Sequence, residues 1–266
     1  MPIRICLAGA TGWVGKVLTR AIRESKEFEL VAVVGKNNAG KQLGDLVNIP
    51  ELDLTIKRTA QEGIASGPDV FIDYTHPSVV KEHVTVAVKA KVPVVIGTSG
   101  LTEKDFDEID HLAEKHQVGV LAAGNFAVTA VLLQKFAMVA ARFVKSWEIL
   151  DYAAAEKPDA PSGTARELAA KLSQVGTPIY HHPIQRTLGQ KESRGAKVEG
   201  TQIHSVRLPG YVFAFEVVFG QANERLTLRQ EAGSGAEPYV MGTLLAVREV
   251  RSFAGLRRGL DTILQF

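Results

Sequence analysis

The sequence is poor in cysteine. Cys6 is the only one among 266 residues, so no disulfide can form within the chain. Its place in an apolar run is typical of a thiol packed in a core, and a chain without disulfides agrees with a reducing compartment. No run approaches the roughly 18 apolar residues that a membrane-spanning helix needs, and the first residues lack the pattern of a signal peptide. We therefore expect a cytoplasmic location and no membrane partner.

An excess of charge of one sign is also lacking. The 31 basic and 29 acidic residues are mixed along the chain and leave a formal net charge of +2. No basic face or tail predicts a nucleic-acid partner. Neither Cys-x-x-Cys nor His-Glu-x-x-His occurs, so we expect no metal site. The hydrophobic content of 45% is ample for a packed core.

Short apolar runs alternate with helical patterns over residues 1–126. The runs are rich in Val and Ile and predict buried strands at 3–8, 30–34, 70–72, 92–96 and 118–122. Helical spacing lies between them, at 14–22, 79–90 and 103–116. Strands joined by helical crossovers imply a parallel sheet covered on both faces. The predicted class is α/β, with a Rossmann-type doubly wound parallel sheet in this first domain.

The pattern changes after Asn125, and residues 127–238 are predicted to form a second domain of the α+β type. Helices are expected at 128–144 and 162–172, with a strand at 147–152. Three β-rich runs indicate a meander at 203–208, 211–219 and 225–230. The polar stretch 185–200 predicts a mobile loop. The C-terminal segment 239–266 opens with helical spacing and is expected to pack back on the first domain.

A glycine-rich turn, residues 9–15, connects the first predicted strand to the first predicted helix. Gly9 permits the tight turn, Gly12 lets backbone amides approach a pyrophosphate, and Gly15 allows the helix to pack closely on the strand. The start of the helix supplies a partial positive charge for the anion. The turn predicts dinucleotide binding, and the alternative is a purely structural glycine turn.

The end of the second strand should meet the adenosine ribose. A carboxylate there would favour NAD, but the chain has none and carries Lys36 instead. A lysine can neutralise a 2′-phosphate, so NADPH is favoured over NADH, and the alternative is an ordinary solvated loop lysine. Asp73 and Thr75 follow another strand, where they either line the nicotinamide cleft or cap the next helix.

Several motifs, in order along nearly the whole chain, resemble those of the bacterial dihydrodipicolinate reductase family, the 4-hydroxy-tetrahydrodipicolinate reductases of lysine biosynthesis. Besides the glycine turn, they are residues 71–77 (Phe-Ile-Asp-Tyr-Thr-His-Pro), 97–100 (Gly-Thr-Ser-Gly), Asn125-Phe126, Lys157 with 159–165 (Asp-Ala-Pro-Ser-Gly-Thr-Ala), and 204–210 (His-Ser-Val-Arg-Leu-Pro-Gly). The segment from Lys157 to Thr164 is the most distinctive of them.

The resemblance implies a homotetramer that transfers hydride from NAD(P)H to a C=N or conjugated double bond of a small carboxylate. It also implies that the second domain, residues 127–238, serves substrate binding and oligomerisation. It implies cofactor contacts at Gly9, Ala10, Thr11, Gly12, Trp13, Val14, Gly97, Thr98, Ser99, Ala123, Asn125 and Phe126. It implies substrate contacts at Lys157, Ser162, Gly163 and Thr164. Amides at a helix N-terminus also suit a carboxylate on physical grounds, and the alternative for that turn is a plain helix cap.

The chain departs from the family pattern at positions that matter for chemistry. Family members usually carry two histidines before the lysine, the first assigned as proton donor, and here Ala153 and Ala154 stand in their places. Other departures are Ala214 for a histidine, Ala236 for an arginine, Gly124 for a proline or alanine, and Trp13 for a basic residue. Loss of a positioned acid typically costs about 10²- to 10⁴-fold in rate.

Lys157 is the best substitute for the missing acid, because an ammonium beside a substrate carboxylate can pair with it and donate a proton. The alternative is that Lys157 only binds the carboxylate. Tyr152, Glu156 and the segment 180–182 (Tyr-His-His) are weaker candidates. Three functions stay open: the family reaction, reduction of another imine by a paralogue, and a non-catalytic cofactor-binding sensor or assembly protein.

Overall fold

The computed structural model describes residues 1–264, so the last two residues of the predicted segment 239–266 lie outside the described residues. The chain divides into two compact units. Unit 1 comprises Met1–Val128 together with the chain from Ala236 onward, and unit 2 comprises Thr129–Gly235. Both divisions lie within three residues of the boundaries expected from the sequence, after 126 and before 239.

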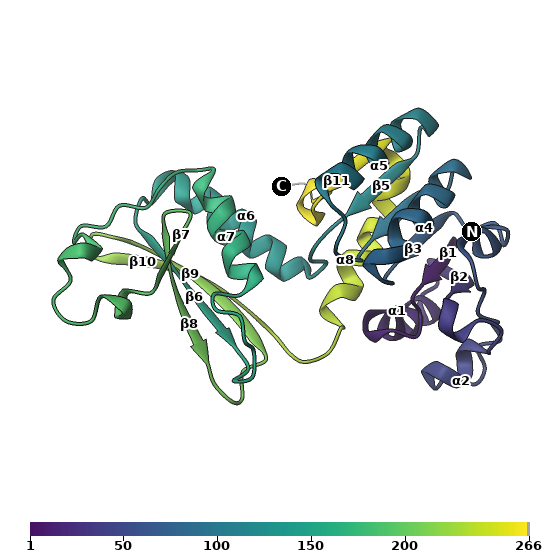
Figure 1. The fold of residues 1–266 in the computed structure, drawn as a ribbon, viewed down its shortest axis with the longest axis horizontal. Helices are drawn as coiled ribbons and strands as arrows, with labels where there is room; N and C mark the ends of the chain where they lie inside the picture. The colour runs from purple at the N-terminus through teal and green to yellow at the C-terminus, as the bar shows by residue number, and fades with distance from the viewer. Residues whose placement is uncertain (265–266) are drawn as a thin grey trace. The chain divides into compact units, whose positions relative to one another are not determined.

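Unit 1 is built on a parallel sheet with the strand order β11-β5-β4-β3-β1-β2 (Figure 1). The Rossmann-type sheet predicted from the apolar runs is confirmed. Its edge strand β11 was not predicted, because its sequence Gly-Leu-Arg-Arg is no apolar run. The strands are β1 (Ile3–Ala8), β2 (Phe28–Val34), β3 (Val70–Asp73), β4 (Val94–Ile96), β5 (Gly119–Ala122) and β11 (Gly255–Arg258).

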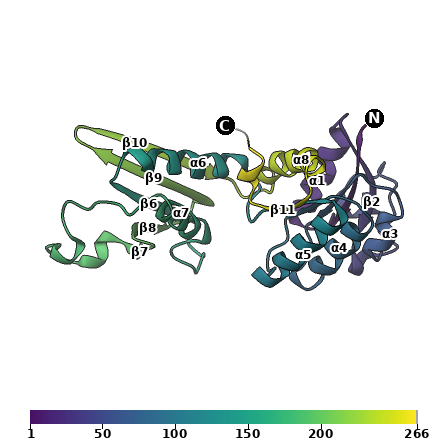
Figure 2. The same cartoon turned by 90° about the horizontal axis from the view of Figure 1, so that it is seen from above.

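Helices cover both faces of this sheet (Figure 2). On one face lie α1 (Trp13–Glu24) and α8 (Pro238–Glu249); on the other lie α3 (Ala60–Ile64), α4 (Pro77–Lys89) and α5 (Glu103–His116). A short α2 (Leu43–Val47) and the turn η1 (Lys36–Asn38) follow β2. The strand order reverses direction between β1 and β3. Such a switch point leaves a crevice at the carboxyl ends of the strands, where ligands bind in open α/β sheets.

The core of unit 1 follows from the spacing of its apolar residues. On α1 the buried residues Gly15, Leu18 and Ile22 recur at helical intervals, so one stripe faces the sheet. Strands β3, β4 and β5 are buried at every residue, as expected for a sheet with helices on both faces. Cys6 is wholly buried in this core, and burial raises the pKa of its thiol.

Unit 2 contains a mixed sheet with the order β10-β9-β6-β8-β7. Strand β6 runs parallel to β8 and antiparallel to β9, and it separates them. The predicted meander is therefore wrong, although β9 and β10 do form a hairpin. Alternating polarity identifies a strand but not its neighbours in the sheet. The strands are β6 (Trp147–Ala153), β7 (Ala196–Val198), β8 (Thr201–Arg207), β9 (Phe213–Gln221) and β10 (Glu224–Ala232).

Two long helices belong to this half of the fold, α6 (Val128–Phe143) and α7 (Gly163–Ser173), and α7 packs against β6, β7 and β8. Buried and half-buried residues alternate along β6, so Asp151 and Ala153 share the buried face. The polar stretch predicted as a loop, 185–200, includes the turns η2 (Ile184–Arg186) and η3 (Lys191–Arg194) and also β7, which was not predicted.

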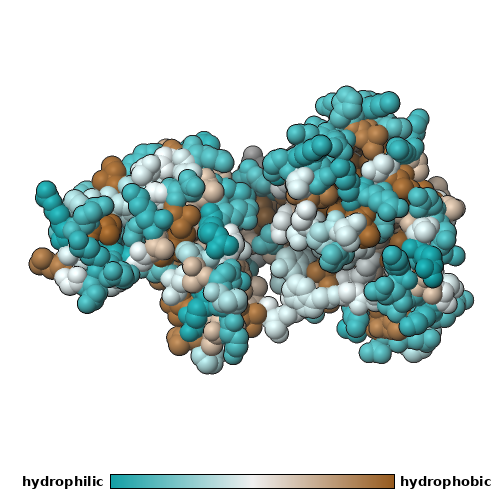
Figure 3. All heavy atoms as spheres, viewed as in Figure 1, coloured by the Kyte–Doolittle hydropathy of each residue, from teal (hydrophilic) through white to brown (hydrophobic). Residues whose placement is uncertain are grey.

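The surface agrees with the balanced composition. Figure 3 shows hydrophilic side chains over much of the face in view, with hydrophobic ones scattered among them. Within residues 1–264, no helix combines the length and the hydropathy needed to cross a membrane.

Candidate active site

The glycine turn has the geometry that dinucleotide binding requires. Gly9 has a φ of +88°, and a Cβ there would lie 2.1 Å from the Tyr74 carbonyl oxygen. A Cβ on Gly15 would lie 2.1 Å from the Gly9 carbonyl oxygen. Gly12 is exposed and is the N-cap of α1, so no side chain caps the first amides of that helix. The turn therefore forms a cradle open to an anion at the start of α1.

A second loop approaches this turn from the end of β2. The Asn38 amide donates to Thr11 Oγ1 at 3.4 Å, and Lys41 Nζ donates to Asn38 Oδ1 at 3.2 Å. Lys36 is exposed at the start of η1 in the same loop. The structure thus adds Lys41 to the residues beside the turn. The sequence did not indicate Lys41, because its position depends on the fold of the loop, through Asn38 and Thr11.

Tyr74 connects the ends of three strands in unit 1. A Cβ on Gly97 would lie 2.1 Å from Tyr74 Cε1, so the ring occupies the space that a side chain at 97 would need. The Tyr74 ring lies 5.9 Å from the ring of Phe126, and its hydroxyl lies 2.7 Å from Thr243 Oγ1. Burial raises the pKa of Tyr74, so the phenol is neutral at physiological pH. Its role is to hold these loops together.

Asp73 also connects these loops, through hydrogen bonds of its side chain. Its wholly buried carboxylate accepts hydrogen bonds from the hydroxyls of Thr75 and Thr98, both at 2.6 Å, and lies 2.7 Å from His83 Nδ1. The N-cap of α4 is His76, which accepts from the Ser78 amide. The capping interpretation of Asp73 and Thr75 is therefore wrong. Asp73 fixes the loop that contains Thr98.

The remaining predicted cofactor residues lie after β4 and β5. The Ala123 amide donates to the Ile96 carbonyl at 3.1 Å, and Asn125 Oδ1 accepts from the Ala127 amide at 2.8 Å. Ser99 is exposed, whereas Ala123 and Phe126 are buried. All the predicted cofactor residues follow the carboxyl ends of β1, β2, β4 and β5, at one edge of the sheet. Their contact with a cofactor stays a prediction.

The substrate residues expected in unit 2 gather at the start of α7. Ser162 is its N-cap, and the Ser162 hydroxyl accepts from the Ala165 amide at 3.3 Å. The two amides before Ala165, those of Gly163 and Thr164, belong to the first turn of the helix, where amides have no partner within the helix. Ser162 is only 1% exposed, so it builds the turn, and its direct contact with a substrate stays a prediction.

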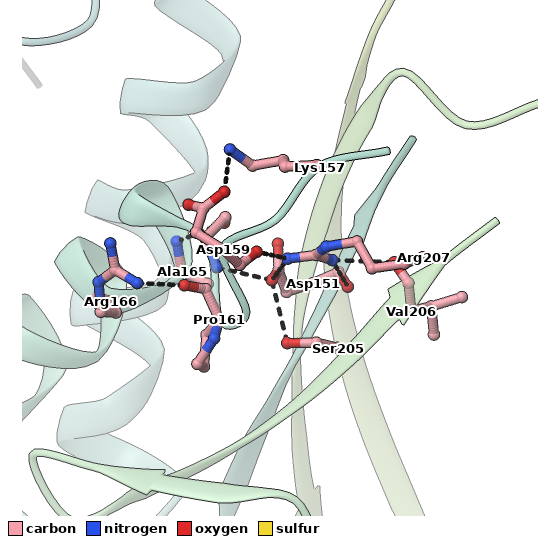
Figure 4. Close-up of polar contacts among 10 residues, drawn as sticks. Asp151, Lys157, Asp159, Pro161, Ala165, Arg166, Ser205, Val206 and Arg207 are labelled. Atoms are coloured by element: carbon pink, nitrogen blue, oxygen red, sulfur yellow. Dashed lines mark hydrogen bonds and ion pairs between the residues drawn. The ribbon is translucent and has the colours of Figure 1, made fainter. Parts of the chain in front are cut away.

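Lys157 lies beside this turn and forms an ion pair with Asp159, with 2.6 Å between Nζ and Oδ1 (Figure 4). Both side chains are about one-third exposed. The ion pair with Lys157 holds the pKa of Asp159 below its ordinary value. A charged Lys157 therefore faces the solvent-accessible side of the turn, where a substrate carboxylate can reach it.

A buried ion pair lies beneath the turn. Asp151 Oδ2 accepts from the Ser162 amide at 2.8 Å, from Ser205 Oγ at 3.1 Å and from Arg207 Nη2 at 2.8 Å (Figure 4). Arg207 Nη2 also donates to the Asp159 carbonyl at 2.7 Å. Sequence reasoning missed Asp151, because the residues that surround it are far away in the sequence.

The positions of the missing family histidines are apolar. Ala153 is wholly buried at the end of β6, and Ala214, in β9, is wholly buried opposite Tyr152. Tyr152 follows Asp151 on β6, so its side chain points to the opposite face of the sheet, where its hydroxyl donates to Glu216 Oε1 at 3.4 Å. Tyr152 is therefore poorly placed to protonate a ligand at the start of α7.

The candidates of the segment 180–182 also lie away from this turn, whereas Glu156 directly precedes Lys157 and is exposed. A cavity of about 540 Å³ in unit 2 is lined by Tyr180, His181 and His182 together with Glu148 and His204. His204 Nε2 lies 2.7 Å from Glu148 Oε2, and this hydrogen bond lowers the pKa of the Glu148 carboxyl. The cavity lining does not include Lys157 or Ser162. In the part of the chain that the structure describes, no cluster of His, Cys, Asp and Glu is arranged to hold a metal ion.

Comparison with known proteins agrees with this geometry. The family model for the N-terminus of dihydrodipicolinate reductase matches residues 3–126, and the model for its C-terminus matches residues 129–264. The chain belongs to the dihydrodipicolinate reductase family. This is a family of NAD(P)H-dependent oxidoreductases, so the family and the reaction class expected from the motifs are confirmed.

Two relatives span the whole chain. The 4-hydroxy-tetrahydrodipicolinate reductase of Geobacillus thermodenitrificans is 38% identical over 100% of both chains. That of Moorella thermoacetica is 35% identical over 99% of this chain and 98% of the relative. Among solved structures, dipicolinate-bound dihydrodipicolinate reductase from Paenisporosarcina sp. TG-14 matches with a TM-score of 0.90 and 32% identity, covering 99% of this chain and all of that one.

Proposed function

We propose that this protein reduces 4-hydroxy-tetrahydrodipicolinate in lysine biosynthesis, with NADPH as the favoured reductant. The observation that carries the proposal is the turn at the start of α7, where Lys157 and the amides of Gly163 and Thr164 present a cation and helix-end donors together. The relatives that share the full length of the chain carry the name of this activity.

The cofactor residues in unit 1 support a nicotinamide dinucleotide. When bound, NADPH supplies the hydride. The open amides at the start of α1 would bind its pyrophosphate, and the lysines after β2, Lys36 and Lys41, would face its 2′-phosphate. The absence of a carboxylate in the segment 35–38 removes the acceptor that would favour NADH.

Residues of unit 2 would bind the substrate and deliver the proton. The amides of Gly163 and Thr164 would donate hydrogen bonds to one substrate carboxylate, favoured by the positive end of the α7 dipole. Lys157 would leave Asp159, pair with the carboxylate, and donate a proton from Nζ to the substrate atom that gains electron density. No histidine is needed in this scheme, because the ammonium supplies both charge and proton.

A second candidate is the reduction of another small cyclic or acyclic imine. It is favoured by one observation: Ala153 and Ala214 place buried methyl groups where the family pattern has histidines. A less polar pocket accepts a substrate with fewer polar groups.

A panel assay separates the two candidates. NADPH oxidation is followed with freshly generated 4-hydroxy-tetrahydrodipicolinate and with a set of cyclic and acyclic imines, and kcat/KM is compared. The first candidate predicts the highest value for the lysine precursor. A higher value for another imine would replace the first candidate with the second.

We further propose that the protein works in the cytoplasm as a homotetramer. The resemblance to the family supports the tetramer, and the single buried thiol agrees with a reducing compartment. A small carboxylate is the partner that the turn before α7 fits best.

A further inference from the structure

The buried pair of Asp151 and Arg207 joins both ends of one short turn. Asp151 Oδ2 binds the amide of Ser162, at the end of the turn, with 2.8 Å between the atoms. Arg207 Nη2 binds the carbonyl of Asp159, near its start, at 2.7 Å, and also binds Asp151 Oδ2 at 2.8 Å. The segment 159–162 is therefore anchored at two backbone points by one ion pair (Figure 4).

The anchored turn connects the two groups proposed to bind the substrate. Gly163 and Thr164 follow directly after Ser162, and the Asp159 side chain pairs with Lys157 at 2.6 Å. A shift of the turn would therefore move the Gly163 and Thr164 amides relative to the Lys157 ammonium. Displacements of this kind are costly, because a misplacement of about 1 Å can lower a rate by about 10²-fold.

The pair is not well arranged as a stabilising interaction. Asp151 is wholly buried and the Arg207 side chain is only 15% exposed, so both groups are largely removed from water. Asp151 Oδ1 and Arg207 Nε are buried and have no hydrogen-bond partner among residues 1–264. Buried ion pairs with unmatched atoms generally contribute little to stability compared with apolar residues. The contacts that are satisfied are those to the turn and to the neighbouring strand.

Asp151 is also poorly suited to act as the missing acid. Burial alone would raise the pKa of its carboxyl, but the ion pair with Arg207 and the hydrogen bonds from Ser162 hold the pKa below its ordinary value. The group is therefore ionised at physiological pH and has no proton to give.

We propose that Asp151 and Arg207 are positioning residues that set the amides of Gly163 and Thr164 against Lys157, so that one substrate carboxylate meets both. The proposal rests on the function proposed above for this turn. It assigns neither residue a contact with the substrate, and both act through the backbone that they bind.

Two variants test the pair, and a second ion pair of unit 2 provides the control. Asp151→Asn removes the charge while preserving the size of the side chain. Arg207→Lys preserves the charge but replaces the two-armed guanidinium with a single ammonium. Glu216→Gln is the matched control, because Glu216 pairs with Arg229 at 3.2 Å and its side chain points to the opposite face of the sheet.

Dipicolinate serves as the probe of the turn, and NADPH as the probe of unit 1, in calorimetric titrations of the full-length protein. We expect Asp151→Asn and Arg207→Lys to weaken dipicolinate binding by at least about tenfold, within the range expected for a misplaced group. NADPH affinity should change less than about twofold, since the variants lie in the other unit. Glu216→Gln should leave both affinities unchanged. Unchanged dipicolinate affinity in both variants would overturn the proposal.

Amide hydrogen exchange of the ligand-free protein gives a readout independent of substrate and of catalysis. Asp151→Asn should accelerate exchange in the segment 159–165 by a larger factor than in the rest of α7. A merely structural role would instead raise exchange by the same factor throughout unit 2. If wild type did not bind dipicolinate, the proposed function would fail, and the exchange pattern alone would decide the positioning role: an excess acceleration in the turn supports it, and the absence of that excess refutes it.

Discussion

At the scale of single residues, the proposed chemistry depends on Lys157. Lys157→Met should lower kcat/KM by about 10²- to 10⁴-fold, because it removes both the cation and the proton. Lys157→Arg preserves the cation, but a guanidinium does not give up its proton. We therefore expect Lys157→Arg to lower kcat strongly while KM changes little.

Steady-state kinetics with both variants decide between the two roles of Lys157. The control is Lys191→Ala, which removes an exposed lysine of unit 2 outside the turn. A Lys157→Arg variant with nearly normal kcat would show that Lys157 only binds the carboxylate, and that the proton comes from elsewhere.

The glycines of the first turn differ in what a side chain would meet. A Cβ on Gly12 would lie 3.2 Å from the Gly9 carbonyl oxygen, whereas a Cβ on Gly15 would lie 2.1 Å from the same atom and 2.7 Å from Ala10 Cα. The Gly12→Ala variant should therefore fold normally. It should bind NADPH at least about tenfold more weakly than wild type, because its methyl group covers the anion cradle. Gly15→Ala should destabilise unit 1 itself.

Circular dichroism melting and cofactor titration separate these outcomes. The expected pattern is a normal melting temperature for Gly12→Ala and a clearly lowered one for Gly15→Ala. Equal NADPH affinity in Gly12→Ala and wild type would contradict the assignment of the cradle.

The proposed preference for NADPH over NADH depends on two exposed lysines, Lys36 and Lys41. Lys36→Ala and Lys41→Ala should each lower the preference for NADPH, measured as the ratio of the two dissociation constants, by about tenfold, or about 1.4 kcal/mol. Lys26→Ala is the control, since Lys26 lies just before the amino end of β2, and the cofactor residues follow the carboxyl ends of the strands. An unchanged ratio in both variants would remove the lysines from the cofactor site.

Predictions for single residues were correct where all the residues of a motif are neighbours in the sequence. The glycine turn and the Ser162 cap are local, and the structure places them as expected. The anchor pair is not local, because Arg207 and Asp151 are 56 residues apart and meet only through the pairing of β6 with β8. Burial of a charged side chain is a property of the assembled sheet, so no pattern in the sequence indicated it.

At the scale of elements, the acid stability of unit 2 should depend on Asp151. Its folded-state pKa is lowered, so its contribution to the free energy of unfolding is fully present above the unfolded-state value of about 3.9 and is lost as the pH falls through the folded value. The difference in unfolding free energy between wild type and Asp151→Asn should therefore shrink as the pH falls from about 5 to about 2.

Urea unfolding followed by tryptophan fluorescence measures this difference. The chain has two tryptophans, so a Trp13→Phe background leaves Trp147 as the only reporter, and it lies in β6 of unit 2. A difference that stays constant over this pH range would show that the carboxylate is not coupled to folding.

Elements were predictable where each strand and helix has a strong pattern of its own. The bounds of β1 and α5 agree with the predicted ranges, because an apolar run and a capped amphipathic pattern define them. The order of the strands in the sheet of unit 2 was not predictable. Strand β6 lies between β8 and β9 because its residues pair with both, and the sequence of a single strand does not indicate its partners. The edge strands β7 and β11 are short and polar, and were missed for that reason.

At the scale of the whole molecule, the proposed function assigns the cofactor to unit 1 and the substrate to unit 2. Unit 1 presents a glycine cradle and loops at the carboxyl edge of a parallel sheet, and unit 2 presents a cation beside a helix N-terminus. The family relation spans both units, since the two family models match residues 3–126 and 129–264. Among the departures from the family pattern, the alanines at 153 and 154 remove the usual proton donor, so any reduction must proceed without those histidines.

The most direct test of that claim is the initial rate of NADPH oxidation by wild-type protein with freshly generated 4-hydroxy-tetrahydrodipicolinate, with Lys157→Met as the blank. We expect saturable turnover at ordinary enzyme rates, of about 1 s⁻¹ or more, which Lys157→Met loses. No turnover above the blank, in a protein that still binds NADPH, would contradict it.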